Sequence, residues 1–474
     1  MTTMNDAYSL SSLRMRRVQN LHFVGIGGAG MCGIAEVLLN EGYRVTGSDL
    51  VHSSTLDRLR NLGVTITLGH LAENAIDADV VITSTAISKT NPEVQYAHNN
   101  QIPVVARAEM LGELLRHRYG IAVAGTHGKT TTTSLITCIF QEAGLDPTYI
   151  IGGLLKSEGR NAKLGGSRYL ITESDESDAS FLKLNPLVVV ICNIDADHLG
   201  TYEHEFVRLL DTFVEFVHRL PFYGLAVVCL DDSGVQQIID RISRPMITYG
   251  VHPEANYRAE NIRYEQTQCV FDVVRPPPYL PLTVQTCLPG IENVRNVLGA
   301  VAIATDEGVS DQHIVDGLAK FQGISRRFEI SELVCGTRIF TLIDDYGHHP
   351  VEIRHVIETT RLLFKTRRLF MVYQPHRYTR TRDLFHDFVA VLSCVDLLVM
   401  VETYAAGEEP INDAKTEDLV EALQQESQIS VHFASSPMDA HALVLRLVHD
   451  SDVVCIQGAG NIDTISNLLK SKCT

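Results

Sequence analysis

The sequence predicts an α/β protein built from three domains. Along most of its 474 residues, a stretch that favours a β-strand is followed by a turn and then by a helix-forming stretch. The strand candidates are continuous runs of valine, isoleucine and leucine, which are typical of strands buried on both faces and therefore of mostly parallel sheets covered by helices. At roughly 100–200 residues per domain, the length indicates about three domains.

Two positions are candidate domain boundaries. A helix is expected to end and a new strand to begin near Arg116–Gly120, and a second break follows a helix near Gly323–Arg327. The proline-rich stretch Arg275–Pro281 is expected to join strands inside the middle domain. We therefore divide the chain into residues 1–117, 118–324 and 325–474. The runs expected to form strands include Leu21–Ile26, Tyr43–Ser48, Val80–Ile82, Ile121–Ala124, Tyr169–Thr172, Leu187–Cys192, Ala226–Leu230, Ile339–Ile343, Leu369–Tyr373, Leu397–Val401 and Val453–Ile456.

The composition argues against several classes of function. The formal charge is −17, and an acidic surface disfavours general nucleic-acid binding and docking on anionic membranes, although a single pocket can still be basic. No apolar run is long enough to cross a bilayer, and residues 1–20 lack the apolar core of a secretory signal. The ten cysteines form no C-x-x-C pair, which fits reduced thiols better than disulfides or a zinc site. We expect a cytoplasmic protein.

The first glycine loop predicts a diphosphate site. Gly25, Gly27 and Gly30 form G-x-G-x-x-G between a predicted strand and a predicted helix. Such glycines let the backbone approach a pyrophosphate at the helix N-terminus, where free N–H groups point at the anion. Asp49 ends the next strand, close to the spacing of about 20 residues expected for an acid that binds a ribose. The motif does not say which nucleotide binds, and a tight turn that needs glycine is the alternative.

A second loop predicts a site for ATP. Gly125, Gly128, Lys129 and Thr130 lie in GTHGKT, between a strand and a helix. In a P-loop the backbone N–H groups surround the phosphates, the lysine reaches the β- and γ-oxygens and the hydroxyl can bind Mg²⁺. Val123 stands where the general motif has its first glycine, so the loop is a shortened variant.

Acidic side chains follow two later strands and suit a magnesium site. The strand RYLIT leads into Glu173-Ser-Asp175-Glu176-Ser-Asp178, and LVVVIC leads into Asn193-Ile-Asp195-Ala-Asp197-His198. A carboxylate at a strand's carboxyl end, in the same unit as a P-loop, is a usual ligand of Mg²⁺. Either cluster alone could be a solvated loop, but their joint position after a GKT loop favours a metal site.

These motifs together resemble the Mur ligase family, whose members are amide-forming ATPases with three domains. The resemblance runs from about Leu21 to the end of the chain, and HFVGIGGAGM narrows it to the alanine-adding branch. Besides GTHGKTTT, ESDESD and NIDADH, it includes RAEML at 107–111, RRF at 326–328, DDYGHHP at 344–350, QPHRYTRTR at 374–382 and QGAGN at 457–461. It implies a Rossmann-like N-terminal domain that binds UDP, a central ATPase-type α/β domain and a Rossmann-like C-terminal domain.

The resemblance implies an activity and a set of partners. The enzyme would use ATP and Mg²⁺, with Mn²⁺ as an alternative, to join L-alanine to the carboxylate of UDP-N-acetylmuramate in peptidoglycan precursor synthesis. The carboxylate would first become an acyl phosphate, which the amine of alanine attacks. No nucleic acid or membrane insertion is expected, and the chain could be a monomer or a homodimer.

The resemblance also assigns roles to individual residues. The UDP-sugar site would contain Gly25, Gly27, Gly28, Ala29, Gly30, Ser48, Asp49, Ser84, Thr85, Ala86, Arg107, Glu109, His127 and Asn193. The ATP site would contain Gly125, Thr126, Gly128, Lys129, Thr130, Thr131, Asn293, Asn296 and Arg327. The metal would be held by Thr130, Glu173 and His198, and alanine by His348, His376, Arg377 and Arg380. The residues expected to act in catalysis are Lys129, His198, Arg327 and His348, and either histidine could accept the amine proton.

One position departs from the family pattern. The adenine segment of the family reads G-x-H-N, and here it is Gly290-Ile291-Glu292-Asn293, so a carboxylate replaces a ring. This puts the adenine contact in question. Three other functions compete with alanine ligation. An NAD-dependent oxidoreductase would leave GTHGKT unexplained, a non-catalytic nucleotide sensor would not need the basic cluster at 376–382, and a related ligase would add a recycled tripeptide in place of alanine.

Overall fold

The structure is a computed structural model, and it describes residues 15–473. The expected features of the N-terminal segment that fall on residues 1–14 lie outside the described residues, as does the side chain of Ala29. The chain separates into two compact units, each described below by itself. Unit 1 comprises Met1–Ile262, Phe271–Gln285 and Arg295–Gln322, and unit 2 comprises Arg263–Val270, Thr286–Val294 and Gly323–Thr474.

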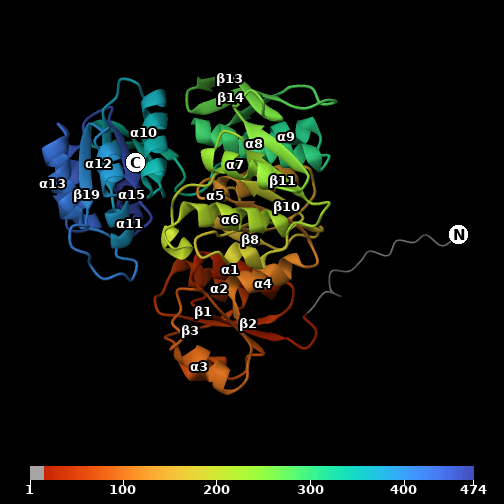
Figure 1. Ribbon diagram of the computed structural model, residues 1–474. Coiled ribbons are helices and arrows are strands. Elements are labelled where there is room, and N and C mark those ends of the chain that lie inside the picture. The colour runs from red at the N-terminus through yellow and green to blue at the C-terminus, as the bar shows by residue number, and fades with distance from the viewer. Residues whose placement is uncertain (1–14, 474) are drawn as a thin grey trace. The chain divides into compact units, whose positions relative to one another are not determined.

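Unit 1 begins with a five-stranded parallel sheet in the order β3-β2-β1-β4-β5 (Figure 1). The chain leaves β1 toward β2 and later returns to β4 on the other side of β1, so the loops after β1 and β4 meet where ligands bind in such sheets. The elements are β1 (Asn20–Val24), α1 (Ala29–Asn40), β2 (Arg44–Asp49), α2 (Ser54–Leu62), β3 (Thr65–Leu68), η2 (Ala72–Ala75), β4 (Val80–Thr83), α3 (Pro92–Asn99), β5 (Val104–Ala106) and α4 (Arg107–Leu115).

A ten-stranded sheet follows, in the order β15-β14-β13-β12-β11-β10-β6-β9-β7-β8. The strand before the P-loop, β6, lies between β9 and β10 and is parallel to both, which brings the two acidic loops beside the P-loop. The elements are β6 (Tyr119–Ala124), α5 (Lys129–Glu142), β7 (Thr148–Leu155), β8 (Arg160–Lys163), β9 (Tyr169–Glu173), η3 (Ser180–Lys183), β10 (Val188–Ile191), η4 (Leu199–Tyr202), α6 (Phe206–His218), β11 (Leu225–Cys229), α7 (Ser233–Ile238), η5 (Ile239–Arg241), β12 (Met246–Gly250), β13 (Tyr257–Glu265), β14 (Gln268–Val274), β15 (Leu282–Thr286), α8 (Ile291–Asp306) and α9 (Asp311–Lys320).

Unit 2 contains a six-stranded sheet in the order β16-β17-β21-β18-β19-β20, antiparallel between β16 and β17 and parallel elsewhere. Its central strands place the loops after β17, β18 and β21 side by side. The elements are β16 (Glu329–Cys335), β17 (Arg338–Asp345), α10 (Pro350–Leu363), β18 (Leu369–Tyr373), α11 (Tyr378–Asp383), α12 (Phe385–Leu392), β19 (Leu397–Val401), α13 (Thr416–Glu426), β20 (Ser430–Ala434), α14 (Pro437–Leu447), β21 (Val453–Gln457) and α15 (Asp463–Lys472).

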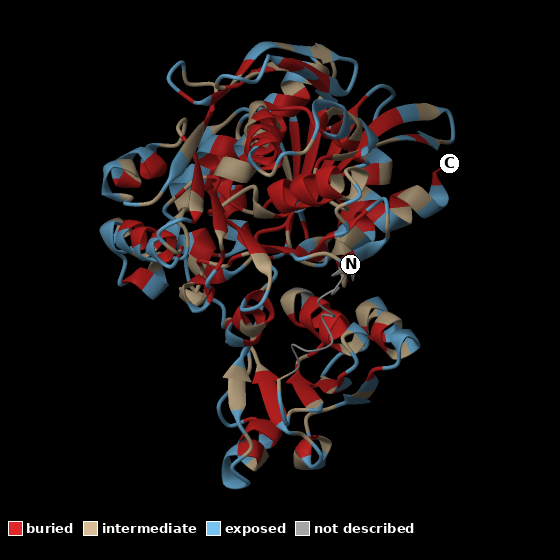
Figure 2. Cartoon of the chain, turned by 90° about the vertical axis from the view of Figure 1, so that its right-hand side faces the viewer, coloured by how far each residue is buried: buried red, intermediate tan, exposed pale blue. Residues whose placement is uncertain are grey.

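The buried residues explain why these strands form where the sequence places them. Figure 2 shows burial concentrated on the strands and on the helix faces that cover them. All five residues of β18, β19 and β21 are buried, as expected for runs of apolar residues covered on both faces. The predicted α/β class and every predicted strand are confirmed, and residues 275–281 join β14 to β15 as expected. Among the described residues, no helix is both long and apolar enough to span a bilayer.

Candidate active site

The first glycine loop is hydrogen-bonded to the end of β2. The backbone N–H groups of Gly25 and Ile26 donate to the Ser48 carbonyl, at 2.9 and 3.0 Å. The N–H of Gly27 donates to Asp49 Oδ2 at 2.8 Å, and a Cβ at Gly27 would lie 2.8 Å from the same oxygen. The motif's second glycine is therefore required for this close approach. Asp49 fixes the loop, and its proposed contact with a ribose remains a prediction.

A buried carboxylate that the sequence did not reveal supports the same loop. Glu93 of α3 has no exposed surface, and its Oε2 accepts a 2.6 Å hydrogen bond from the Ser48 hydroxyl. His70 Nδ1 lies 2.9 Å from that hydroxyl, and Asn74 donates to Glu93 Oε1 at 2.6 Å. Burial alone would raise the pKa of Glu93, but hydrogen bonds with His22, Ser48 and Asn74 hold it below the usual value. Glu93 is therefore an ionised anchor beneath the loop.

The other residues assigned to the UDP-sugar differ in whether they contact the first glycine loop and the helix after it. Residues 84–86 follow β4, and Ile87 lies 3.2 Å from the position that a Cβ at Gly25 would take, so this loop contacts the glycine loop. Arg107 begins α4 and reaches the first turn of α1, because its guanidinium occupies the space that a Cβ at Gly30 would take. Glu109, two residues further along α4, is exposed.

The P-loop surrounds the ammonium group of Lys129. Gly125 and Gly128 have positive φ angles of 132° and 82°, which favour glycine at both turns. Lys129 Nζ donates to the carbonyls of Gly125 and Thr126 and lies 2.8 Å from Glu176 Oε2. Burial alone would lower the pKa of Lys129, but Glu176 and its acidic neighbours raise it above the ordinary value. The lysine is therefore charged in the site.

The predicted metal ligands Thr130 and Glu173 lie together. The Thr130 hydroxyl donates to Glu173 Oε2 at 3.1 Å, and the N–H of Gly152 donates to Oε1. The Thr130 hydroxyl in the first turn of α5 and the Glu173 carboxylate at the end of β9 offer two oxygen ligands. They fit Mg²⁺, which commonly takes one or two protein oxygens and fills its other positions with phosphates and water. No group of three or more histidine, cysteine, aspartate or glutamate side chains in the described part of the chain is arranged to hold a metal ion.

His198 is placed by the loop after β10. Its φ of 56° is left-handed, and its Nε2 lies 3.4 Å from Asp197 Oδ2. The same loop is tied to the P-loop by two reciprocal bonds: the His127 N–H donates to Asn193 Oδ1 at 2.8 Å, and Asn193 Nδ2 donates to the His127 carbonyl at 3.0 Å. His127 and Asn193 thus contact each other, while their place in the UDP-sugar site and the role of His198 at a metal remain predictions.

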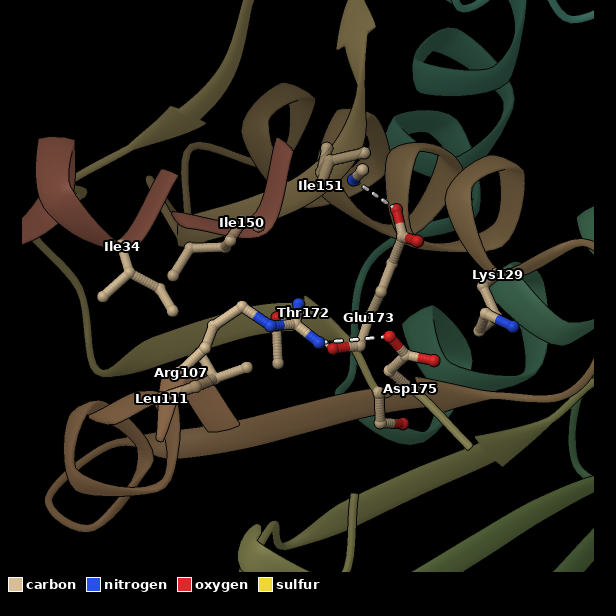
Figure 3. A pocket seen from close by; sticks show the side chains of 12 residues that line it. Ile34, Arg107, Leu111, Lys129, Ile150, Ile151, Thr172, Glu173 and Asp175 are labelled. Atoms are coloured by element: carbon tan, nitrogen blue, oxygen red, sulfur yellow. Dashed lines mark hydrogen bonds and ion pairs between the residues drawn. The ribbon is translucent and has the colours of Figure 1, made fainter. Parts of the chain in front are cut away.

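A cavity of about 290 Å³ lies between the first turn of α1 and the P-loop (Figure 3). Its polar lining includes Arg107, Lys129, Glu173 and Asp175, and its apolar lining consists of Ile34, Leu111, Ile150 and Ile151. The cavity therefore joins the predicted diphosphate loop to the predicted site of phosphoryl transfer, within unit 1. Arg107 and Lys129 give it two cations that suit an anionic ligand.

The two asparagines assigned to adenine have separate surroundings. Asn296 Oδ1 accepts a 3.1 Å bond from the Thr132 hydroxyl, and a Cβ at Gly128 would lie 2.6 Å from the same oxygen. Asn296 therefore supports the P-loop directly. Within unit 2, Asn293 Nδ2 donates to the Pro289 carbonyl at 2.7 Å, and the unusual Glu292 has Oε1 3.3 Å from His355 Nε2.

In unit 2, Asp345 connects three loops near Arg327. Its carboxylate accepts bonds from the N–H groups of Phe328 and Gly347 at 2.8 Å and from Gln457 Nε2 at 2.9 Å. The Arg327 guanidinium lies 5.3 Å from the centre of the Tyr346 ring, and its Nη1 lies 3.9 Å from Glu352 Oε1. Asp345 therefore fixes the segments that carry Arg327 and His348. The sequence motif contained this aspartate but did not assign it a role.

The residues assigned to alanine meet at the carboxyl ends of β17 and β18. The rings of His348 and His376 are 5.4 Å apart, and the His376 ring stacks on Tyr404 at 5.5 Å. Arg380 is 8% exposed, and its Nη1 donates to the His376 carbonyl at 3.1 Å. Arg377 has a side chain that is 50% exposed and lies 3.6 Å from Glu408. His348, His376 and Arg380 therefore form one cluster, whereas Arg377 lies at its exposed side.

Both histidines of this cluster are neutral near pH 7. Burial lowers the pKa of His348 to about 3, and the positive charge of Arg380 acts in the same direction. Burial and the charges of Arg380 and Arg377 lower the pKa of His376 to about 4. A neutral imidazole can accept a proton, so His348 has the protonation state that a base requires.

Models of three Mur ligase domains match successive parts of the chain. The model described as Mur ligase family, catalytic domain matches residues 20–119, the Mur ligase middle domain matches residues 123–304, and the Mur ligase, glutamate ligase domain matches residues 326–460. The chain belongs to the Mur ligase family. Mur ligases use ATP to form amide bonds, so this chain is an ATP-dependent ligase of peptidoglycan precursor synthesis.

Solved structures of other Mur ligases resemble the chain over most of its length. UDP-N-acetylmuramate-alanine ligase MurC from Thermotoga maritima has a TM-score of 0.81 at 27% identity, and the match covers 96% of this chain and 98% of that chain. The murein peptide ligase from Psychrobacter arcticus has a TM-score of 0.71 at 23% identity, with the same coverage, and shares the fold. A third structure is the UDP-N-acetylmuramate:L-alanyl-γ-D-glutamyl-meso-diaminopimelate ligase from Neisseria meningitides. It has a TM-score of 0.60 at 26% identity, and the match covers 65% of this chain and 100% of that chain.

Some residues of this Mur ligase's site were not identified from the sequence. Glu93 and Glu408 lie in a helix and a loop whose sequences give no functional signal. Asp175 and Glu176 lie in a segment that was selected for its acidity, but only the fold shows which cation each one contacts. The acidic pattern of 173–178 is a signal for Asp175 and Glu176, whereas no pattern in the sequence marks Glu93.

Proposed function

We propose that this Mur ligase joins L-alanine to the carboxylate of UDP-N-acetylmuramate, with ATP converted to ADP and phosphate. The observation that carries this proposal is the full-length similarity to an alanine ligase of UDP-N-acetylmuramate, at a TM-score of 0.81 and 27% identity. The His376 ring lies 5.4 Å from the His348 ring and 5.5 Å from the Tyr404 ring, and this crowding supports a small amino acid. The reaction takes place in the cytoplasm, where the precursor and ATP are available.

The cavity of unit 1 suits the first half of the reaction. Lys129 carries a positive charge for the β- and γ-phosphates of ATP, and Arg107 carries one toward the sugar nucleotide. A bound Mg²⁺, held by Thr130 and Glu173, would neutralise phosphate charge during transfer. The sugar's carboxylate attacks the γ-phosphorus and forms an acyl phosphate, and ADP leaves. Neutralisation is essential because both reacting groups are anions.

Unit 2 supplies groups suited to the second half. We assign Arg380 to the carboxylate of alanine and Arg327 to the phosphate. The free amine attacks the acyl carbon, and the tetrahedral intermediate collapses to the amide and phosphate. The amine must lose a proton, and the neutral imidazole of His348 is the acceptor that we favour within unit 2 because it lies in the cluster with Arg380 and His376, although a pKa of about 3 makes it a weak base.

Addition of a tripeptide is the second candidate function. Similarity to the murein peptide ligase from Psychrobacter arcticus, at a TM-score of 0.71, favours it over unrelated reactions. Phosphate release from ATP and UDP-N-acetylmuramate should be measured with no amine, with L-alanine and with L-alanyl-γ-D-glutamyl-meso-diaminopimelate. We expect alanine to give the larger kcat/KM. A larger value with the tripeptide would reverse the assignment.

The acyl phosphate has its own isotopic test. When the sugar's carboxylate carries ¹⁸O, one labelled oxygen should pass to the released phosphate, because that oxygen attacks the γ-phosphorus and stays on it when the amide forms. Mass spectrometry of the phosphate measures the transfer. Unlabelled phosphate from a complete turnover would exclude this route.

A further inference from the structure

Each cation that lines the cavity of unit 1 is bound to one of two adjacent acidic residues. Arg107 lies 3.1 Å from Asp175, and Lys129 lies 2.8 Å from Glu176. Arg107 and Lys129 are the only arginine or lysine side chains in the described lining of this cavity. Figure 3 shows Asp175 between the two cations. The loop after β9 therefore supplies a counter-ion to both.

Every N–H donor of the Lys129 ammonium is already used. The group has three donors, and its hydrogen bonds go to the carbonyls of Gly125 and Thr126 and to the Glu176 carboxylate. Glu176 is 3% exposed, so water does not screen this pair. A phosphate oxygen can therefore reach Lys129 only by taking over a hydrogen bond, and the carboxylate is the partner that carries the same charge as a phosphate.

The Arg107 pair has the same arrangement. Asp175 Oδ2 accepts from Arg107 Nη2, while Oδ1 accepts from the Ser177 N–H at 3.1 Å. The guanidinium lies against Gly30 in the first turn of α1, the end of a helix that favours anions. Asp175 is an anion beside a site predicted for an anionic ligand.

We propose that Asp175 and Glu176 are exchange partners for the substrates: Glu176 holds Lys129 until the ATP phosphates take its place, and Asp175 holds Arg107 until the anionic part of the UDP-sugar does. Both are positioning residues. The carboxylates keep Arg107 and Lys129 oriented before a substrate binds. They also limit how tightly nucleotides bind, because each ion pair with a substrate replaces an ion pair within the protein. Release of ADP then restores the pair between Lys129 and Glu176. The Asp175 half rests on the proposed function, whereas the Glu176 half needs only ATP.

The decisive experiment compares binding of Mg-ADP and of UDP-N-acetylmuramate by calorimetry in Glu176→Gln and Asp175→Asn. Loss of a hydrogen bond between charged groups changes affinity roughly tenfold. We expect Glu176→Gln to bind ADP about tenfold more tightly and to release it more slowly in stopped flow, with UDP-N-acetylmuramate little changed. Asp175→Asn should show the reverse pattern, with about tenfold tighter binding of the UDP-sugar and a smaller gain in ADP affinity, because the hydrogen bond of Asp175 goes to Arg107 and its charge also acts on Lys129.

Two further variants separate exchange from a general effect of charge. Asp178→Asn removes a charge from the same loop, at a residue whose carboxylate accepts from the Ser180 N–H, and it should leave both affinities unchanged. Glu176→Asp keeps the charge but withdraws the carboxylate by one methylene, and it should still tighten ADP. It also carries the test if thermal unfolding shows that Glu176→Gln does not fold.

Three results would overturn the proposal. Weaker or unchanged ADP binding in both Glu176 variants would mean that the carboxylate supports Lys129 in the bound state as well. An equal gain in Asp178→Asn would mean that only the net charge matters. The same effect of Asp175→Asn and Glu176→Gln on both ligands would remove the one-to-one assignment. Tighter ADP binding by a protein that does not bind UDP-N-acetylmuramate would contradict the proposed function and leave the Glu176 half standing.

Discussion

Arg377 and Arg380 occupy one short segment after β18, yet their side chains have different surroundings. Arg380 is 8% exposed and lies against His376, whereas the Arg377 side chain is 50% exposed and faces Glu408. From the sequence, Arg377 and Arg380 were equal candidates for binding the carboxylate of alanine. Burial favours Arg380, because an ion pair shielded from water is stronger than an exposed one.

Arg380→Lys should raise the KM for alanine, with smaller changes in the constants for ATP and the UDP-sugar. Lysine cannot reproduce the two-bond contact of a guanidinium with a carboxylate, and loss of such a pair from a buried site costs on the order of 2–5 kcal/mol. Arg377→Lys is the matched control, and steady-state kinetics should show a smaller effect. Normal alanine kinetics in both variants would place the pocket elsewhere.

Glu292→His should leave ATP affinity level or raise it, and alanine affinity should change little. The side chains of Glu292 and His355 are each 30% exposed, so their loss as a pair costs little, while an imidazole restores the residue usual in the family. Calorimetry with Mg-ATP measures the first effect. His355→Gln breaks the same pair without adding a ring at position 292 and serves as the control. A collapse of activity in Glu292→His alone would give Glu292 a role that the family pattern does not describe.

At the scale of elements, the long apolar strands and the helices after glycine loops could be predicted from the sequence. The strands at the two edges of the central sheet could not. The strands β7 and β8 form a hairpin beside β9, and β13 to β15 extend the other edge of the central sheet. β8 and β13 contain polar residues and have mixed burial, and glycines interrupt the apolar residues of β7, so no long apolar run marks them. Their pairing depends on an existing sheet edge, which local sequence does not contain.

The contact between α5 and α9 depends on a glycine. A Cβ at Gly317 would lie 2.8 Å from the Ile139 Cα, which belongs to the helix backbone and cannot rotate away. Gly317→Ala should therefore destabilise the fold by about 1–3 kcal/mol, despite the better helix propensity of alanine. Gly200→Ala is the control, since no atom lies within 4 Å of its added Cβ, and it should stay within about 0.5 kcal/mol. Denaturant unfolding measures both, and equal stability would show that the helices move apart at little cost.

At the scale of the whole molecule, stability should fall as the pH drops below about 6.5. The pKa values of His348 and His376 are lowered to about 3 and about 4, so the unfolded chain takes up two protons that the folded chain does not. Burial raises the pKa of Asp232 to about 6 and also raises the pKa of Asp306, Asp344 and Asp345, which opposes this trend, whereas the lowered pKa of His441 adds to it. The histidines titrate first in the unfolded chain as the pH falls, so they set the sign at the upper end of the range, between about pH 6.5 and pH 6.

Urea unfolding across that range measures the effect, and His376→Gln should flatten the dependence because glutamine does not titrate. Asp232→Asn should make it steeper, since the opposing proton is lost. A stability that rises as the pH falls would contradict the neutral state of the two histidines, and with it the choice of His348 as the proton acceptor.

The sequence alone determined the class of fold, the two phosphate loops and the family. These properties are local: glycine spacing after a strand sets the backbone shape of a loop, and runs of apolar residues set which strands are buried. The family resemblance also assigned His348, His376 and Arg380 to one site, and the structure brings them together. Tertiary structure decided which charges meet. Lys129 is 47 residues from Glu176, Arg107 is 68 from Asp175, and Ser48 is 45 from Glu93. Strand order and helix packing bring these distant residues into contact. No pattern in the segment around one residue of a pair indicates where its partner lies.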